Sequence, residues 1–436
     1  MRNRFLYTIK DKKEFAEKLV FWAKIFKYSC FLDSNPQSKK MPIAYSQYEF
    51  LFAVGAHKIC CSNKDSFENL KVFHNRYKDW MFGYFSYDLK NETNTLTSEN
   101  MDNLYFPNLF FFIPEIVFSM KNKVLYVDTF SNKKETDIII DEIKNQICDE
   151  LFYGNLKMKK RETKEEYLKK IKKIKTHIKR GDIYEMNYCQ EFFSENTELN
   201  AEALFFRLNK KTKAPFSSFL HLDDKYLICF SPERFLRKEN QQILSQPIKG
   251  TRKRSKNKEE DSQLKKELSL SEKDKSENVM ITDLVRNDLS KYARQASVKV
   301  EELFGVYSFE QVHQMISTIS AELESNYHFI DAIKGAFPMG SMTGAPKRKA
   351  MELIEKFECT KRGLFSGSVG YISPNADFDF NVVIRSILYN ATKKYFSVMA
   401  GGAITSRSVA EEEYEECLIK VKTILEISSG KKVNAE

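Results

Sequence analysis

The amino-acid sequence predicts an α+β protein in which large, mostly antiparallel sheets pack as a sandwich and are covered by helices. Short apolar runs rich in aromatic residues alternate with polar turns, as is typical of antiparallel sheets. A few longer segments instead carry an amphipathic helical period. The chain has 436 residues and is 42% hydrophobic, which is enough to bury a large core. We therefore expect strands to fill the interior and helices to cover it.

The first part of the chain predicts strands but carries no recognisable chemistry. Runs such as YFPNLFFFIPEIVFSM and VLYVDTF alternate with polar turns. We interpret residues 1–155 as an N-terminal β-rich region that packs on the core. A lysine-rich linker then leads to a second region, residues 163–427, in which the motifs with chemical potential occur.

A helix is predicted at the start of this second region, in TKEEYLKKIKKIKTHIKRGD. Tyr167, Ile171, Ile174 and Ile178 share one face, and Gly181 closes the segment. The strands FSSFLHL, KYLICFSPERFLR and QQILSQPIKG follow with short polar breaks, which indicates an antiparallel meander.

Lys249 has unusual flanking residues in this meander. It lies where the run QQILSQPIKG ends, between Pro247-Ile248 and Gly250-Thr251. The spacing from Glu233 is about two short strands and a turn, so both side chains are expected at ends of neighbouring strands and in one cleft. The alternative is an ordinary solvated lysine, because the chain is rich in this residue type.

Acidic side chains on two predicted helices suit a magnesium site. In SVAEEEYEECLIKVKTILEI, Glu413, Glu416 and Lys420 share one helical face, and the glycine pair GG at 401–402 is expected to end the preceding strand and let a ligand approach. Glu277 is expected to open the helix SENVMITDLVRNDLSKYA. One or two carboxylates together with substrate oxygens and water suit octahedral Mg²⁺. The alternatives are a solvated Glu416–Lys420 pair and a helix-dipole acid.

Two further features could bind an anion. GSMTGAPK, residues 340–347, lacks the spacing of a nucleotide phosphate loop, but its glycine-rich turn before a helix start can present backbone N–H groups to a carboxylate. Arg385 lies in the apolar segment FNVVIRSIL, where a guanidinium is costly unless it is paired.

Composition argues against several other classes of protein. The net charge of +10 permits nucleic-acid binding, but basic runs alternate with acids and no nucleic-acid-binding motif is present. No run approaches the roughly 18 apolar residues of a membrane span, and MRNRFLYTIKDKKEF becomes charged too early for a signal peptide. The eight cysteines and six histidines show no zinc-ligand spacing. We expect a cytoplasmic protein without a membrane segment, and any metal to be held by oxygen.

Taken together and in order, these motifs resemble those of the chorismate-utilising enzymes. The resemblance covers about residues 163 to 427 and includes SPE, PIKGT, ENVMITDLVRNDL, GSMTGAPK, GLFSGSVGY, AGGAI and EEEYEECLIK. It implies the chorismate-binding enzyme fold, chorismate as substrate and Mg²⁺ as cofactor. Glu277 and Glu416 would be Mg²⁺ ligands, with Glu413 supporting them.

The resemblance also implies a set of substrate contacts. Arg385 and Lys420 would hold the pyruvyl carboxylate, and Thr251 would belong to the same substrate site. The Gly344 and Gly402 regions would supply backbone donors. His313, in FEQVHQMIST, matches a family histidine near the ring, with a hydrogen-bonded core histidine as the alternative.

Within this family, lysine in PIKGT is typical of the aminodeoxychorismate synthases, whereas the anthranilate synthases and the isochorismate group usually have alanine. Lys249 would attack C2 of chorismate while Glu233, as general acid, protonates the departing C4 hydroxyl. Ammonia would then enter at C4 and expel the lysine, giving 4-amino-4-deoxychorismate for para-aminobenzoate and folate synthesis. We expect burial and nearby cations to lower the pKa of Lys249.

Glu185 departs from the family pattern. Water-adding members carry a lysine base at this position, which makes an isochorismate or salicylate product unexpected here. Amine-adding members usually have glutamine.

The family resemblance further implies a partner. No cysteine lies in a GxCxG elbow, so ammonia is expected from a separate glutamine amidotransferase subunit, with no fused lyase. Two alternatives stay open: an anthranilate synthase component I, and a catalytically inactive basic binding protein that keeps the fold.

Overall fold

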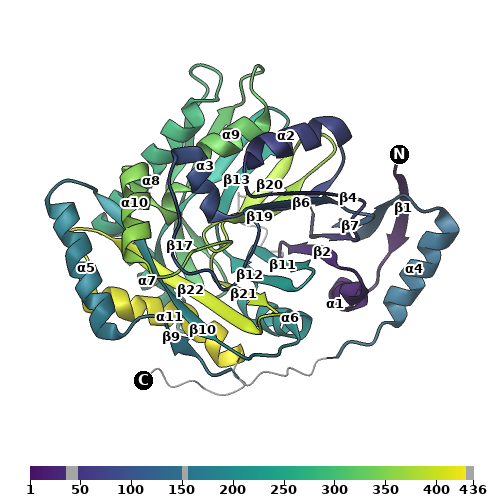
Figure 1. The fold of residues 1–436 in the computed structure, drawn as a ribbon, viewed down its shortest axis with the longest axis horizontal. Coiled ribbons are helices and arrows are strands. Elements are labelled where there is room, and N and C mark those ends of the chain that lie inside the picture. The colour runs from purple at the N-terminus through teal and green to yellow at the C-terminus, as the bar shows by residue number, and fades with distance from the viewer. Residues whose placement is uncertain (36–47, 150–155, 429–436) are drawn as a thin grey trace.

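Two large antiparallel sheets form the centre of the computed structural model, which describes residues 1–35, 48–149 and 156–428 (Figure 1). In the described residues the first sheet has twelve strands. Their order is β1 (Asn3–Thr8), β8 (Val124–Thr129), β7 (Ile116–Lys121), β3 (Phe50–Val54), β2 (Tyr28–Asp33), β11 (Phe216–Leu222), β12 (Lys225–Ser231), β21 (Ser386–Asn390), β22 (Tyr395–Ile404), β10 (Glu185–Ser194) and β18 (Gly344–Ala345), with β9 (Lys159–Lys160) also on β10.

The second sheet has ten strands in the same part of the chain. Their order is β15 (Ile248–Lys253), β17 (Val312–Glu322), β14 (Gln242–Gln246), β13 (Arg234–Glu239), β20 (Phe378–Asn381), β19 (Ser368–Ile372), β5 (Met81–Phe85), β6 (Leu109–Ile113) and β4 (Lys58–Ser62), with β16 (Lys299–Ser308) also on β17.

The largest apolar cluster joins the two sheets. Leu220 and Leu227 of the first sheet belong to the same buried cluster as Phe82 and Leu236 of the second. The ring of Tyr28 on β2 stacks on that of Phe110 on β6 with centroids 5.5 Å apart. The predicted sandwich of mostly antiparallel sheets is therefore confirmed.

Helices cover the outer surfaces of this sandwich (Figure 1). They are α1 (Lys12–Trp22), η1 (Ala23–Ile25), α2 (Ser66–Tyr77), η2 (Tyr87–Leu89), α3 (Lys90–Asn94), α4 (Lys133–Asn145), α5 (Lys164–Lys179), α6 (Ala201–Thr212), α7 (Lys258–Leu270), α8 (Glu272–Ser290), α9 (Phe329–Ala336), η3 (Gly340–Met342), α10 (Lys347–Phe357) and α11 (Ala410–Ser428). Leu19 on α1, Ile140 on α4, Leu204 on α6 and Val421 on α11 share a second apolar cluster with strands of the first sheet.

Helix α5 forms where the sequence predicts it. Thr163 caps it in a reciprocal capping box with Glu166, and Tyr167, Ile171 and Ile174 are fully buried. Gly181 follows with a positive φ of 81°, which suits a helix terminus. The predicted helix and its buried face are therefore confirmed.

Two segments predicted to form strands are each divided between the sheets. KYLICFSPERFLR forms β12 in one sheet and β13 in the other, and FNVVIRSIL forms β20 and β21. Pro232 cannot donate to a ladder, and Arg385 has a left-handed φ of 50°, so the extended backbone breaks at both points. The two crossovers run side by side, because Val382 N donates to Glu233 O (3.0 Å) and Phe230 N donates to Arg385 O (3.1 Å).

The N-terminal residues supply strands to both sheets in addition to packing on the core. Strand β2 lies between β3 and β11 in the first sheet, and β5 pairs with β19 in the second. Both sheets are thus completed by strands from each end of the chain.

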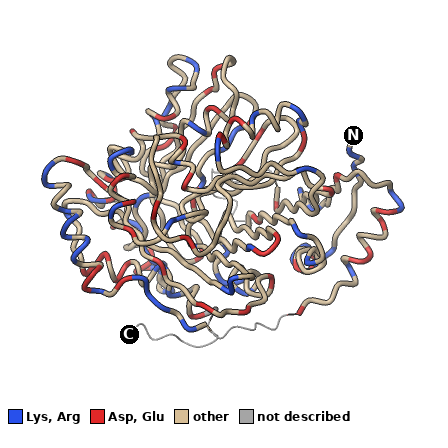
Figure 2. Tube along the Cα trace, viewed as in Figure 1, with Lys and Arg blue, Asp and Glu red and all other residues tan. Residues whose placement is uncertain are grey.

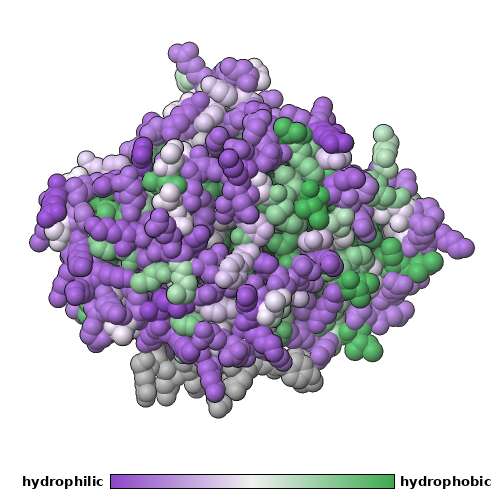
Figure 3. Space-filling view, in the orientation of Figure 1, coloured by the Kyte–Doolittle hydropathy of each residue, from purple (hydrophilic) through white to green (hydrophobic). Residues whose placement is uncertain are grey.

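The surface does not present one sign of charge. Acidic and basic residues are interspersed along the outer helix α4, whereas α5 carries its glutamates in the first turn and lysines over the rest of its length (Figure 2). The face in Figure 3 is mostly hydrophilic, with the more hydrophobic residues gathered toward the end that carries β1 and α4. Of the helices in the described ranges, none combines the length and apolar character that crossing a membrane requires.

Candidate active site

Lys249 lies inside the protein and pairs with Glu185. Its Nζ is 2.6 Å from Oε1 of Glu185, and the two residues are 8% and 1% exposed. Lys249 is the second residue of strand β15 and does not end a strand, and the ladder between β15 and β17 is irregular there. Gly250, with a φ of 89°, allows this bulge, which turns the lysine toward β10. The interpretation as a solvated lysine is therefore wrong.

The pKa of Lys249 moves in the opposite direction from our expectation. Burial on its own lowers it, but the carboxylates of Glu185, Glu277 and Glu233 outweigh burial and raise the pKa above the usual lysine value. The expected lowering was wrong because the sequence could not show how many acids surround this side chain.

Glu233 is the buried acid of the site. It occupies the crossover between β12 and β13, and burial raises its pKa to about 7, with the Ser341 hydroxyl, Lys249 and the Ile248 backbone opposing the rise. Glu233 and Lys249 were expected at the ends of neighbouring strands, but β13 and β15 are not neighbours in the sheet. Glu233 instead interacts electrostatically with Lys249 from the crossover between the sheets.

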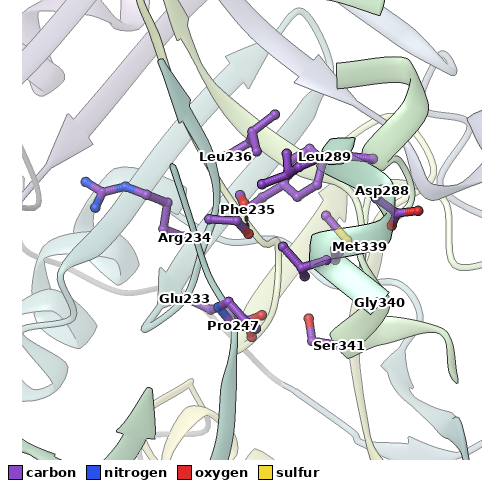
Figure 4. A pocket seen from close by; sticks show the side chains of 13 residues that line it. Glu233, Arg234, Phe235, Leu236, Pro247, Asp288, Leu289, Met339, Gly340 and Ser341 are labelled. Atoms are coloured by element: carbon purple, nitrogen blue, oxygen red, sulfur yellow. Dashed lines mark hydrogen bonds between the residues drawn. The ribbon is translucent and has the colours of Figure 1, made fainter. Parts of the chain in front are cut away.

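A pocket borders Glu233. Figure 4 shows Glu233, Pro247 and Ser341 along one side of it and Leu236 and Leu289 along the other. The Ser341 hydroxyl is buried and lies on the same side of the pocket as the Glu233 carboxyl. A carboxyl group with these surroundings can hold a proton near neutral pH.

Glu277 faces the same lysine from helix α8. The helix begins at Glu272 behind an N-cap at Ser271, so Glu277 lies in its second turn and does not open it as predicted. Burial raises its pKa to about 7; Lys249 opposes this rise and Glu185 adds to it. In the described part of the chain this half-buried carboxylate has neither a hydrogen bond nor an ion pair, which leaves its oxygens available to a cation.

The other acids converge on Gly402. A β-carbon at this glycine would lie 2.9 Å from Glu413 Oε2, 3.8 Å from Lys420 Nζ and 3.9 Å from Glu416 Oε1. The glycine pair was expected to end the strand before α11. It lies instead within β22, which continues to Ile404. A side chain at this position would displace the Glu413 carboxylate, so glycine leaves room for the side chains from α11.

Lys420 and Glu416 form the ion pair that the sequence suggested. Lys420 Nζ lies 2.7 Å from Glu416 Oε1 and donates to the carbonyl of Gly401 at 2.7 Å. Glu413 is buried, and its pKa is raised by burial and by the charge of Glu416.

These carboxylates fit Mg²⁺ in their chemistry. Glu277 has no ion-pair partner in the described part of the chain, and Glu413 and Glu416 add hard oxygen ligands, as this ion prefers. No three acidic, histidine or cysteine side chains of the described residues converge on one point in the present side-chain positions. Lys273 acts electrostatically on all three glutamates, and the sequence analysis missed it. Lys273 could have been found from its position in the sequence, one helical turn before Glu277.

Arg385 is a cation with no counterion among the described residues. Its guanidinium has no hydrogen bond or ion pair in the residues that the structure describes, and burial alone lowers its pKa. Since an unpaired guanidinium is costly inside a protein, this residue is suited to an anionic ligand. It lies at the sheet crossover and not within a strand, which corrects its predicted position.

The GSMTGAPK turn is fixed against β10. Gly344 has a φ of 150°, and a β-carbon there would lie 2.2 Å from the carbonyl oxygen of Glu185. Arg362, which the sequence analysis missed, donates to the carbonyls of Met342 (2.6 Å) and Asn187 (3.0 Å). It also pairs with Glu358, and only the i,i+4 spacing of these two residues marked them in the sequence.

The surroundings of His313 and Thr251 do not support their predicted roles in substrate binding. His313 is 1% exposed, and its Nδ1 and Nε2 lie 2.8 Å from Ser308 Oγ and 3.0 Å from Asp261 Oδ1, an arrangement that favours the alternative of a core histidine. Thr251 is exposed on β15 opposite Gln314. Both substrate contacts stay predictions.

Curated relatives of this chain are named aminodeoxychorismate synthase or anthranilate synthase. The chain is 41% identical over 263 residues to aminodeoxychorismate synthase component 1 of Escherichia coli, a match that covers 60% of this chain and 57% of that protein. It is 30% identical over 369 residues to anthranilate synthase component 1 of Aquifex aeolicus, covering 80% and 74% of the two chains. For the Escherichia coli relative the match thus stays below two thirds of its own length.

A solved structure shares the fold. Anthranilate synthase component I from Streptococcus pneumoniae superposes with a TM-score of 0.76 at 21% identity, over 89% of this chain and 94% of that one. The family model described as chorismate binding enzyme matches residues 27–426. This match extends well into the N-terminal region, where the sequence motifs were weak, and the chain belongs to the family of chorismate binding enzymes.

Proposed function

We propose that this protein converts chorismate and ammonia into 4-amino-4-deoxychorismate, as component 1 of an aminodeoxychorismate synthase. The observation that carries the proposal is Lys249, a lysine that is 8% exposed and lies among Glu185, Glu233 and Glu277. Such a lysine can attack carbon once it has lost its proton, a loss that its raised pKa opposes. The similarity to the Escherichia coli protein of that name supports the same activity.

In the proposed reaction, Lys249 attacks C2 of chorismate and the C4 hydroxyl departs. Glu233 donates the proton that turns this hydroxyl into water, which its pKa of about 7 allows near neutral pH. Ammonia then attacks C4, the bond between C2 and the lysine nitrogen breaks, and the product retains its pyruvyl group.

Substrate anchoring falls to the cationic side chains. Arg385 has a free guanidinium for a bidentate carboxylate contact, and Lys420 sits beside the Gly401–Gly402 backbone. We propose that Glu277 and Glu416 hold Mg²⁺, with Glu413 in support. When bound, the ion would neutralise carboxylate charge and favour departure of the hydroxyl.

The proposal includes a partner and a location. Ammonia would come from a separate glutamine amidotransferase subunit, consistent with the designation component 1 in relatives. The enzyme would act in the cytoplasm on chorismate.

Anthranilate synthase component I is the second candidate, favoured by the 30% identity to the Aquifex aeolicus protein. It would use the same substrate, but its product lacks the pyruvyl group. A buried lysine at the position of Lys249 argues for the first candidate.

The deciding experiment is to incubate the purified chain with chorismate, Mg²⁺ and ammonium and to identify the product by mass. 4-Amino-4-deoxychorismate without pyruvate is expected. Pyruvate with anthranilate would favour the second candidate, and unchanged chorismate would favour an inactive binding protein. Chorismate without ammonia should leave an adduct of substrate minus water on the wild-type chain, and Lys249→Ala should remove it.

A further inference from the structure

Glu185 is in direct contact with the atom that is proposed to react. Its Oε1 lies 2.6 Å from Nζ of Lys249, whereas its Oε2 is buried and makes no hydrogen bond within the described residues. Such a carboxylate has a free position for a proton, and it is 1% exposed, so bulk water does not serve it.

The backbone around Glu185 is held firmly. It begins β10, pairs with Ala345 of β18, and lies against Gly344, where no side chain would fit. Arg362 binds the carbonyl of Asn187 two residues further along. This support fixes the carboxylate with respect to the lysine.

Lys249 has to lose a proton before it can attack carbon. Four carboxylates act on it or feel its charge: Glu185 from β10, Glu233 from the β12–β13 crossover, Glu277 from α8 and Glu416 from α11. Glu233 has to keep its proton for the departing hydroxyl, and Glu277 and Glu416 are the proposed metal ligands. Lys273 and Lys420 are cations and cannot accept a proton.

We propose that Glu185 is the proton acceptor that converts Lys249 from an ammonium ion into a free amine. This inference rests on the proposed function. The Nζ–H bond breaks and the proton moves to the Glu185 carboxylate, so the pair stays neutral overall. The amine then forms its bond to C2, and its proton returns from Glu185 when ammonia has entered at C4 and the C2–N bond breaks.

A glutamine in this position could hold the lysine by hydrogen bonding but could not take its proton. With Glu185, the pair carries its own base, and formation of the amine does not depend on the proton concentration in solution. With an amide, the lysine has to lose its proton to solvent, and the rate should increase with pH. The two side chains are nearly equal in size, which makes Glu185→Gln a clean test.

The experiment compares kcat/KM for chorismate in the wild type and in Glu185→Gln between pH 6 and 8, with saturating ammonia and a Mg²⁺ concentration saturating for each protein. Glu185 does not contribute to the shifted pKa of Glu233, so the effect of Glu233 cancels in the ratio of variant to wild type. It does contribute to that of Glu277, which is why Mg²⁺ is titrated separately. We expect a ratio well below 1 at pH 6 that rises by about tenfold per pH unit.

Glu191→Gln is the matched control, because Glu191 is a second buried glutamate of β10 and pairs with Arg161 instead of Lys249. Its ratio should not change with pH. Thermal melts establish that each variant is folded. If the amide variant unfolds, Glu185→Asp replaces it and should be slower than wild type with a pH-independent ratio.

A ratio for Glu185→Gln that is flat, or that exceeds 1 at pH 6 and falls with pH, overturns the inference. The second pattern is expected if Glu185 only stabilises the ammonium form. In either case wild-type production of 4-amino-4-deoxychorismate would leave the proposed function standing. A wild type that makes no such product overturns both.

Discussion

Replacing Lys249 with alanine should lower the free energy of unfolding, because it breaks the buried ion pair between Lys249 and Glu185. The substitution leaves Glu185, 1% exposed, without its lysine partner, and a buried charge without its partner costs about 3–5 kcal/mol. We expect the free energy of unfolding to fall by about this amount at pH 8. At pH 5.5 the loss should be smaller, because a proton on the carboxylate removes the buried charge.

The assay is chemical denaturation, followed by circular dichroism at both pH values and without Mg²⁺. The proteins are the wild type, Lys249→Ala, Glu185→Gln and the double variant. Since the amide carries no charge, the double variant should recover more than half of the loss at pH 8. Equal losses at both pH values, together with a double variant no more stable than Lys249→Ala, would refute the reasoning.

Four other substitutions test the remaining roles. Glu277→Gln and Glu416→Gln should each raise the Mg²⁺ concentration needed for half-maximal activity, by about tenfold or more, because each removes an anionic ligand; an unchanged metal titration would count against them as ligands. Arg385→Lys should raise KM for chorismate by about tenfold or more with the thermal midpoint nearly constant, since an ammonium group cannot make the forked contact; a wild-type KM would show that Arg385 serves the fold. For Glu233, the raised pKa means that the proton is present below about pH 7 and lost above it, so kcat/KM should fall above this pH in the wild type. Glu233→Gln should remove that fall and slow the reaction by about 10²–10⁴-fold; a variant that keeps the wild-type profile would exclude Glu233 as the acid.

Local patterns predicted the parts of the molecule that depend on neighbours in sequence. The apolar period of α5 is visible over a few residues, and the helix is present with that face buried. The shared face of Glu413, Glu416 and Lys420 on α11 follows from helical spacing alone. The framing of Lys249 by Pro247 and Gly250 correctly indicated a special backbone position.

Contacts between distant segments could not be read in this way. Alternation of apolar residues shows that a segment is extended but not which sheet it enters, so the crossovers at Glu233 and Arg385 were missed. The pairing of Lys249 with Glu185 depends on how β15 and β10 approach in space. The raised pKa of Lys249 follows from that approach and was therefore predicted with the wrong sign.

The insertion of N-terminal strands into both sheets has a consequence for synthesis of the protein in the cell. Strand β5 leaves the ribosome early, but its partner β19, which pairs Ser368 with Phe85, is made near the end of translation. Until then the apolar edge of MFGYF has no neighbour on that side, and an unpaired strand edge invites pairing with other chains. The nascent chain therefore has to be shielded, by chaperones or by transient collapse, for most of its elongation. A fragment that begins at residue 163 would lack six strands of the first sheet and three of the second, and it should aggregate when expressed alone.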